Sequence, residues 1–242
     1  MLGKSKRVTG EEASQTNLLR SIDHAELRPS ATYADIRRVC LEARHFGIGA
    51  VIVHPVHCER AASYLRGSDV RLVAAVGFPS GAFTIEGKLF EAREAIAQGA
   101  SEIDYVTNVG ALCSGNRAWV LREMEALREA TRNHVLKATL EACVLTDAQK
   151  RLGCRLAVDA GIDFVVTSTG FGAAGATVED VRLMRDALGA QVRVSAAGDI
   201  RTLRDAWELI RAGASRLRTS SGVCIAQEWG GELREEGKLE QQ

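Results

Sequence analysis

Short runs of apolar and β-branched residues alternate along this chain with longer segments in which apolar residues recur every three or four positions. Runs of this length and composition predict buried strands. Seven of them are clear, and residues 21–27 are the candidate for an eighth. The seven lie at residues 50–55, 71–79, 102–108, 134–142, 163–170, 191–198 and 215–222.

The longer segments have the period of amphipathic helices. Several begin on Thr or Asn with an acidic residue in the first turn and end on Gly, which is typical of helix N-caps and C-caps. These helices are predicted at residues 32–47, 57–67, 85–99, 116–132, 146–161, 177–189 and 202–213.

Strand and helix therefore alternate about eight times, which indicates a parallel sheet because a parallel crossover normally contains a helix. Eight such units favour an α/β fold of the closed (β/α)8 type, a TIM barrel, as a single domain over residues 17–226. An open doubly wound sheet is the alternative, and it requires one or two of these strands to be wrong. Residues 1–16 and 227–242 are polar or rich in glycine and glutamate, so we expect both segments to be flexible.

The overall charge excludes some partners. The chain has 242 residues, 46% of them hydrophobic, and its 31 basic residues balance 31 acidic ones, so there is no general attraction to nucleic acid or an anionic membrane. No apolar run approaches the roughly 20 residues of a membrane span, and the first residues lack the apolar centre of a signal peptide. We expect a cytoplasmic protein with a small-molecule substrate, bound to neither nucleic acid nor membrane.

Three of the late strands end in glycine, serine and threonine, at residues 167–172, 196–202 and 219–222. Such residues are the usual ones in turns. Three such turns after consecutive strands also form a credible cradle for one phosphate, because glycine allows close approach and clustered N–H groups donate to an anion. The candidate phosphate-binding residues are Thr169, Gly170, Gly198, Asp199, Ser220 and Ser221, with Arg201 and Arg218 as sources of charge.

Several longer strings carry a family resemblance. Residues 22–32 (IDHAELRPSAT), 76–112 (with GFPSGA and EIDYV), 163–185 (with TSTGF and GATVEDV), AAGDIRT and TSSGV closely resemble deoxyribose-phosphate aldolase. The resemblance covers about residues 17–226. It implies a (β/α)8 barrel, a phosphorylated sugar aldehyde as the ancestral substrate, and often a homodimer or homotetramer.

The resemblance also implies two lysines that this chain lacks. Family enzymes form a Schiff base on a strand-6 lysine, where this chain has Val166, and a second lysine on strand 7 tunes the first, where it has Ser195. An imine needs a primary amine, which neither side chain supplies. We therefore expect a divergent member with lysine-independent chemistry.

Other family positions are retained. The resemblance assigns proton movement at the reacting carbon to Asp104, and it matches Asp23 and Glu141 to a strand-1 aspartate and a strand-5 glutamate. Alternation along a strand puts Lys137 and Glu141 on one face. Two interpretations stay open for Lys137, a satisfied ion pair inside the barrel or a displaced nucleophile.

Residues at the mouth of the barrel depart from the family pattern. His54 replaces an asparagine, either as an acid or base or as a cap of its loop. Glu26, Arg28 and Arg218 are also unusual there, and the arginines are either surface charge or a grip on a carboxylate or second phosphate. His54 and His57 lack matched ligand spacing and the six cysteines form no CxxC pair, so we expect no metal and no cofactor.

Three functions remain open. The first is an aldolase-like enzyme that acts on a phosphorylated or carboxylated sugar or aldehyde by acid–base chemistry, as a C–C lyase or synthase, a cyclase, a dehydratase or an isomerase. Its catalytic candidates are Asp104, Lys137, Glu141, Asp23 and His54. The second is a deoxyribose-phosphate aldolase with Lys137 as a displaced Schiff-base lysine. The third is a non-catalytic phosphosugar-binding protein.

Overall fold

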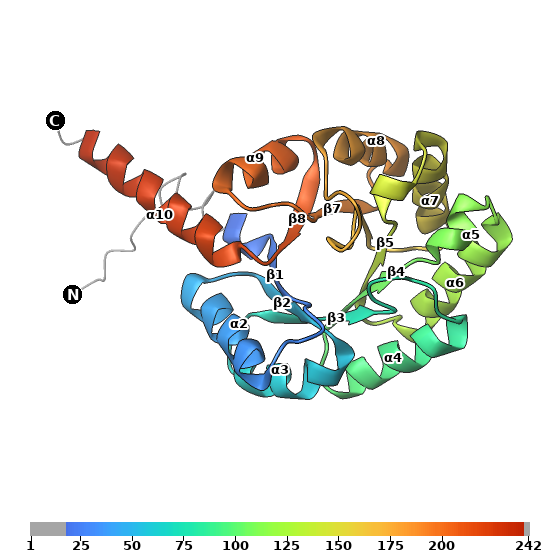
Figure 1. Ribbon diagram of the computed structural model, residues 1–242, viewed down its shortest axis with the longest axis horizontal. Helices are drawn as coiled ribbons and strands as arrows, with labels where there is room; N and C mark the ends of the chain where they lie inside the picture. Colours follow the sequence, from blue (N-terminus) through green and yellow to red (C-terminus); the bar gives the residue numbers. More distant parts are fainter. Residues whose placement is uncertain (1–17, 240–242) are drawn as a thin grey trace, which may run out of the picture.

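The strands form a closed barrel in which each strand is parallel to both of its neighbours (Figure 1). The computed structural model describes residues 18–239. It confirms the predicted single-domain (β/α)8 barrel, including the eighth strand predicted at residues 21–27. The alternative prediction, an open doubly wound sheet, is wrong. The strands are β1 (Ile22–Glu26), β2 (Ala50–Val53), β3 (Arg71–Val76), β4 (Glu102–Val106), β5 (Val135–Thr139), β6 (Phe164–Val166), β7 (Arg193–Ala197) and β8 (Ala214–Thr219).

Helices surround the barrel as an outer ring. Thr32, Thr146 and Thr202 begin three of them with complete capping boxes, in which the threonine hydroxyl and the side chain three residues later each pair with backbone N–H. The long helices are α2 (Tyr33–Phe46), α3 (Cys58–Leu65), α4 (Ile85–Ala97), α6 (Arg117–Ala130), α7 (Asp147–Asp159), α8 (Val178–Leu188), α9 (Leu203–Arg211) and α10 (Gly222–Leu239).

Three short helical segments were not predicted, because each is too short to show a helical period. They are η1 (Pro55–His57), α5 (Val109–Cys113) and η2 (Ala142–Val144). The predicted strand at 134–142 was also too long, since its last residues leave the sheet and enter η2.

The last helix extends past the expected end of the barrel. Figure 1 shows α10 projecting outward from the barrel, and its backbone is helical to Leu239. Flexibility of residues 227–239 stays a prediction, and the segments 1–16 and 240–242 lie outside the described residues. Within residues 18–239, no helix combines the length and apolarity needed to cross a membrane.

A large apolar cluster lies outside the barrel, between the strands and the surrounding helices. The space inside the barrel has an apolar part and a charged part. Inside the barrel, a small cluster of Leu27, Ala50, Ile52, Val73 and Ala75 comes from the side of β1, β2 and β3. The register aligns Ala75 with Asp104 and Asp104 with Lys137, so alternation puts charged side chains of β4 and β5 inside the same barrel.

Candidate active site

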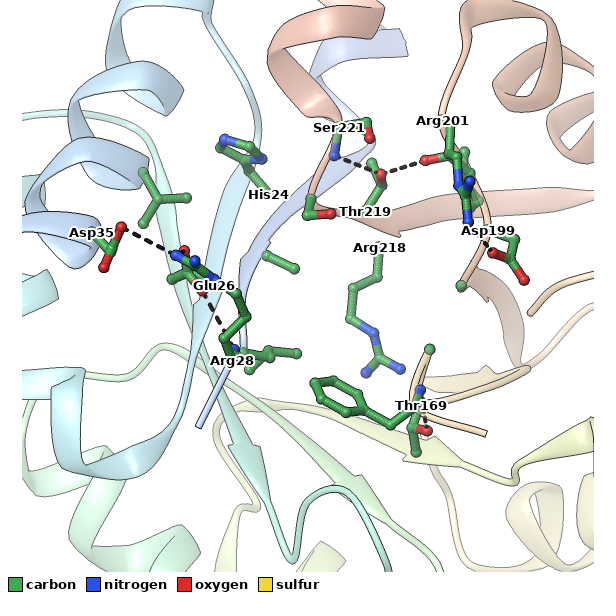
Figure 2. A pocket seen from close by; sticks show the side chains of 18 of the residues that line it. His24, Glu26, Arg28, Asp35, Thr169, Asp199, Arg201, Arg218, Thr219 and Ser221 are labelled. Carbon is green, nitrogen blue, oxygen red and sulfur yellow. Dashed lines mark hydrogen bonds and ion pairs between the residues drawn. The ribbon is translucent and has the colours of Figure 1, made fainter. Parts of the chain in front are cut away.

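A pocket of about 560 Å³ opens where β1, β6, β7 and β8 end. This is the end of a (β/α)8 barrel where functional groups normally lie. Figure 2 shows Arg218 extending from β8 into the pocket, between Glu26 and Arg28 on one side and Thr169 on the other. All of the predicted phosphate-binding residues line it, namely Thr169, Gly170, Gly198, Asp199, Arg201, Arg218, Ser220 and Ser221.

Glycine is required where the loops after β6 and β7 meet. Gly170 and Gly198 have φ angles of 82° and 87°, in the left-handed region that favours glycine. A Cβ on Gly175 would lie 2.3 Å from the carbonyl carbon of Gly198, so the two loops pack backbone against backbone. Asp199 joins them further, because its carboxylate accepts a hydrogen bond from Gly175 N at 3.0 Å.

The loop after β8 leads directly into a long helix. Ser220 and Ser221 precede α10, whose first turn has unpaired N–H groups and the positive end of the helix dipole. Ser221 N donates to the Thr219 hydroxyl at 2.9 Å, and that hydroxyl donates to the Ile200 carbonyl at 2.6 Å. This turn is therefore held against the loop after β7, beside the glycines of the cradle.

Most of the arginines at the rim are already paired. Glu26 accepts from Arg28 Nε at 2.8 Å and from Arg38 Nη2 at 3.2 Å, and Arg28 also lies 3.1 Å from Asp35. Burial alone would raise the pKa of Glu26, but the Arg28 contacts outweigh burial and lower it. Hydrogen bonds from Thr32 hold the pKa of Asp35 well below its usual value. Rim charge is thus largely neutralised within the protein.

Arg201 is paired in the same way. Its Nη2 atom donates to Asp199 at 3.0 Å, and both side chains are exposed. The Asp199 carboxylate therefore offsets the positive charge that Arg201 brings to the cradle.

Arg218 forms the floor of the pocket. Its Nη1 atom lies 2.7 Å from Asp104 Oδ2, and its Nη2 atom donates to the Ser168 carbonyl. The side chains of Arg218 and Asp104 are only 2% and 1% exposed. The second oxygen of Asp104 accepts from the Thr139 hydroxyl at 2.7 Å. Arg218 lines the pocket and Asp104 does not, so the predicted proton-transfer carboxylate lies directly beneath the guanidinium.

A cluster of four charged side chains lies deeper in the barrel, and we call Asp23, Glu102, Lys137 and Arg216 the buried charge cluster. Lys137 Nζ is 2.7 Å from both Asp23 Oδ2 and Glu102 Oε2. Arg216 Nε is 3.0 Å from Asp23 Oδ1, and Arg216 Nη1 is 3.3 Å from Glu102 Oε1.

The cluster shifts the titration of its own carboxyl groups. Burial alone would raise the pKa of Asp23, but Lys137 and Arg216 outweigh burial and lower it to about 2. The same two cations lower the pKa of Glu102. Lys137 therefore lies in a buried lysine–carboxylate network whose carboxylates are Asp23 and Glu102.

Glu141 is not a member of that cluster, contrary to our expectation from strand alternation. It has φ 60°, which breaks the alternation just after β5. Its carboxylate accepts from Thr169 N at 3.3 Å and from the Thr169 hydroxyl. Glu141 therefore holds the loop after β6 in place and lies away from Lys137.

His54 and Lys88 both make structural contacts. The His54 ring nitrogen Nε2 is 3.0 Å from the Leu27 carbonyl, which links the loops after β1 and β2, and His54 does not line the pocket. Lys88 Nζ pairs with Glu123 Oε1 at 2.5 Å and donates to the Val106 carbonyl, with both side chains fully buried. Burial lowers the pKa of Lys88 and raises that of Glu123.

Val166 and Ser195, the two positions where the resemblance implies lysines, are neighbours in the register of β6 and β7. Both are buried, and neither lines the pocket. Among the lysine side chains that the structure describes, none lines the pocket either. In the described part of the chain there is also no group of three or more metal-ligating side chains.

Some pocket residues escaped the sequence analysis. His24, Arg38 and Phe171 gave no signal there, since each fits an ordinary strand, helix or loop position, and Asp35 has the ordinary role of the third residue in a capping box. Glu102 and Arg216 were missed because their pairing depends on residues far apart in the sequence.

Comparisons with known proteins agree with this architecture. Residues 13–226 match the model of the DeoC/LacD family aldolase. The deoxyribose-phosphate aldolase of Thermoanaerobacter pseudethanolicus is 46% identical over 216 residues, which cover 88% of this chain and 97% of that protein. The enzyme of the same name from Brevibacillus brevis is 48% identical over 209 residues, covering 86% and 95% of the two chains.

A solved structure is also similar. It is deoxyribose phosphate aldolase from Aeropyrum pernix, described as having a unique tetrameric structure. It superimposes with a TM-score of 0.84 at 30% identity, over 90% of this chain and 93% of its own.

Proposed function

Because this chain belongs to the DeoC/LacD family of aldolases, we propose that it is an aldolase-type lyase that forms no Schiff base on a lysine. The proposed substrate is a phosphorylated or carboxylated sugar- or aldehyde-type molecule. Cleavage or formation of a C–C bond is the favoured reaction, and cyclisation, dehydration and isomerisation share its first step, removal of a proton near a carbonyl.

The glycine-rich cradle supports a phosphorylated substrate. Gly170 and Gly198 bring backbone close to the pocket, and Ser220 and Ser221 lie at the start of α10. A helix N-terminus with free N–H groups and small neighbours favours an anion. We propose that the phosphate binds between these turns, which leaves the carbon chain directed toward the floor of the pocket.

The observation that carries the proposal is the position of Lys137. Its ammonium group is fully buried and lies 2.7 Å from a carboxylate oxygen of both Asp23 and Glu102. A lysine nucleophile must lose its proton and reach a carbonyl carbon. Lys137 is held by two negative charges below the floor of the pocket, so imine formation there requires breaking the buried charge cluster.

Acid–base chemistry fits the groups at the floor better. Asp104 is held by Thr139 and Arg218, so its carboxylate has a fixed position directly under the pocket. A positioned carboxylate of this kind is suited to proton transfer. In this proposal Glu141 orients Thr169 and the loop after β6, and Asp23 and Lys137 stabilise the barrel.

Borohydride trapping tests the absence of an imine. The protein is incubated with deoxyribose 5-phosphate and a panel of other phosphorylated aldehydes and ketones, reduced, digested and examined by mass spectrometry. A Schiff-base aldolase of the same family serves as the positive control. Turnover without a stable adduct is the expected result. An adduct on Lys137 contradicts the proposal and supports the displaced lysine.

The same substrates separate an enzyme from a binding protein. If phosphosugars bind without turnover, and binding is unchanged in Asp104→Asn, the chain is a non-catalytic phosphosugar-binding protein. A loss of turnover in Asp104→Asn with retained binding is the result that we expect.

We also propose a homodimer or homotetramer in the cytoplasm. The tetrameric relative from Aeropyrum pernix supports the assembly. Size-exclusion chromatography with light scattering measures it directly, and a monomeric mass contradicts it.

A further inference from the structure

We propose that Arg218 is a catalytic residue, whose guanidinium group binds the carbonyl oxygen of the substrate and stabilises the negative charge that develops on it. This inference rests on the proposed function. It assigns Arg218 the electrostatic role that a positively charged imine plays in a lysine-dependent reaction, instead of a role in phosphate binding.

The first support is the position of the side chain. Arg218 leaves β8 and crosses the interior of the barrel to Asp104 on β4, with its other terminal nitrogen on the Ser168 carbonyl after β6. One contact on each terminal nitrogen fixes the plane of the guanidinium. A preorganised donor of this kind needs no rearrangement when charge develops, which is the condition for strong electrostatic catalysis.

The second support is burial combined with access. The Arg218 side chain is 2% exposed, and the Phe78 ring lies 5.3 Å from its guanidinium carbon. The side chain nevertheless lines the pocket. A charge in such poorly solvated surroundings interacts more strongly with a ligand than one at the rim.

The third support is unused hydrogen-bonding capacity. A guanidinium has five N–H donors. Its contacts with Asp104 and Ser168 use one donor on each terminal nitrogen, so further N–H groups remain for a substrate oxygen. The floor therefore presents a cation with unused donors, as expected of a site for an oxyanion.

The charge balance explains why the cation becomes effective during the reaction. In the resting site, Asp104 neutralises Arg218. In C–C cleavage, the proton of the substrate hydroxyl passes to Asp104 by way of the Arg218 N–H groups that lie between the pocket and this carboxylate, the C–C bond breaks, and its electron pair moves into an enolate. Asp104 is then neutral, so Arg218 faces the enolate oxygen as its remaining negative partner. Return of the proton from Asp104 to the enolate carbon restores the original pair.

Binding of enolate mimics tests this role without knowledge of the natural substrate. The ligands are 2-phosphoglycolate and 3-phosphoglycerate, which carry a carboxylate near a phosphate, and ethyl phosphate, which has the phosphate alone. Isothermal titration calorimetry measures their affinities for wild type, Arg218→Met and Arg218→Lys. We expect wild type to prefer at least one carboxylate ligand by about 10- to 100-fold, the range for a hydrogen bond to a charged group.

The variants separate Arg218 from the phosphate cradle. Arg218→Met should lose the preference while keeping the affinity for ethyl phosphate, and Arg218→Lys should retain part of the preference. Since Arg218→Met leaves Asp104 buried without its cation, the double variant Asp104→Asn/Arg218→Met provides a neutral floor if the single variant folds poorly. Arg204→Met, on the exposed face of α9, is the matched control and should behave as wild type.

Two results overturn the inference. A wild type that binds all three ligands equally, or a double variant that keeps the carboxylate preference, shows that Arg218 does not bind the developing oxyanion, and leaves the proposed function intact. If wild type binds none of the ligands, including ethyl phosphate, the phosphate cradle of the proposed function is wrong as well.

Discussion

Lys137 Nζ lies 2.7 Å from Asp23 Oδ2, and both side chains are completely buried inside the barrel. The same ammonium group contacts Glu102, so it joins β5 to β1 and β4 across the interior. This relationship makes Lys137 the central cation of the buried charge cluster, and it leads to the first prediction.

Lys137→Met should lower the free energy of unfolding by about 3–5 kcal/mol, because it leaves two buried carboxylates with one fewer cation. Urea denaturation measures the change. Arg132→Met removes an exposed ion pair with Glu129 and should leave the free energy of unfolding nearly unchanged. Equal losses in the two variants would show that the buried pairing is not what stabilises the barrel.

The stability of the protein should fall in acid because of Asp23. Its pKa is near 3.8 when unfolded and about 2 when folded, so its contribution is fully present above about pH 5 and is lost as the pH falls through 2. A shift of this size corresponds to roughly 2 kcal/mol. The lowered pKa of Glu102 acts in the same direction.

Urea unfolding between pH 5 and 2 measures this dependence. Asp23→Asn has no proton to bind at this position, so its stability should vary less with pH than that of wild type. An identical pH dependence in the two proteins would assign the acid sensitivity to other groups.

Val166→Lys alone should not restore efficient cleavage of deoxyribose 5-phosphate. Val166 is buried and does not line the pocket, and Ser195 would leave the new amine without the second lysine that the family resemblance implies. Borohydride trapping and aldehyde release measure the outcome. In Val166→Lys/Arg218→Gly the floor is removed, so adduct formation should exceed that of the single variant. Robust activity of Val166→Lys by itself would show that neither the buried position of residue 166 nor the missing second lysine prevents the reaction.

Gly175→Ala should disturb the phosphate cradle. Its Cβ would lie 2.3 Å from the Gly198 carbonyl carbon, and a backbone atom cannot move aside as a flexible side chain can. We expect a loss of about 1–3 kcal/mol in stability, the usual range for overpacking, together with weaker binding of ethyl phosphate. Gly230→Ala is the control, because a Cβ there meets no atom within 4 Å. Unchanged binding of ethyl phosphate in Gly175→Ala would show that the cradle does not bind the phosphate.

The fold was predictable because its signals are local. Apolar runs such as residues 50–55 mark buried strands, and threonine caps such as Thr202 mark the starts of helices, so the order of elements follows directly from neighbouring residues. The cradle was predictable for a similar reason, since Gly170 and Gly198 lie in short turns just after strands.

The floor of the pocket was not predictable, because its contacts join distant parts of the chain. Arg218 and Asp104 are 114 residues apart, and only the closure of the barrel brings them together. Strand alternation correctly put Lys137 inside, but it failed two residues beyond β5, where the left-handed backbone of Glu141 reverses the pattern. A local rule of this kind ends where the hydrogen-bonded strand ends.

The Arg218 side chain lies between the residues that line the pocket and the buried charge cluster that joins the strands of the barrel. Substitutions in the loops after β1, β6, β7 and β8 lie above it, whereas Asp23, Glu102, Lys137 and Arg216 lie below. Laboratory evolution for a new substrate can therefore vary the side chains that line the pocket above Arg218 with little loss of thermal stability, provided that Arg218, the buried charge cluster and the close backbone contact between Gly175 and Gly198 are left unchanged.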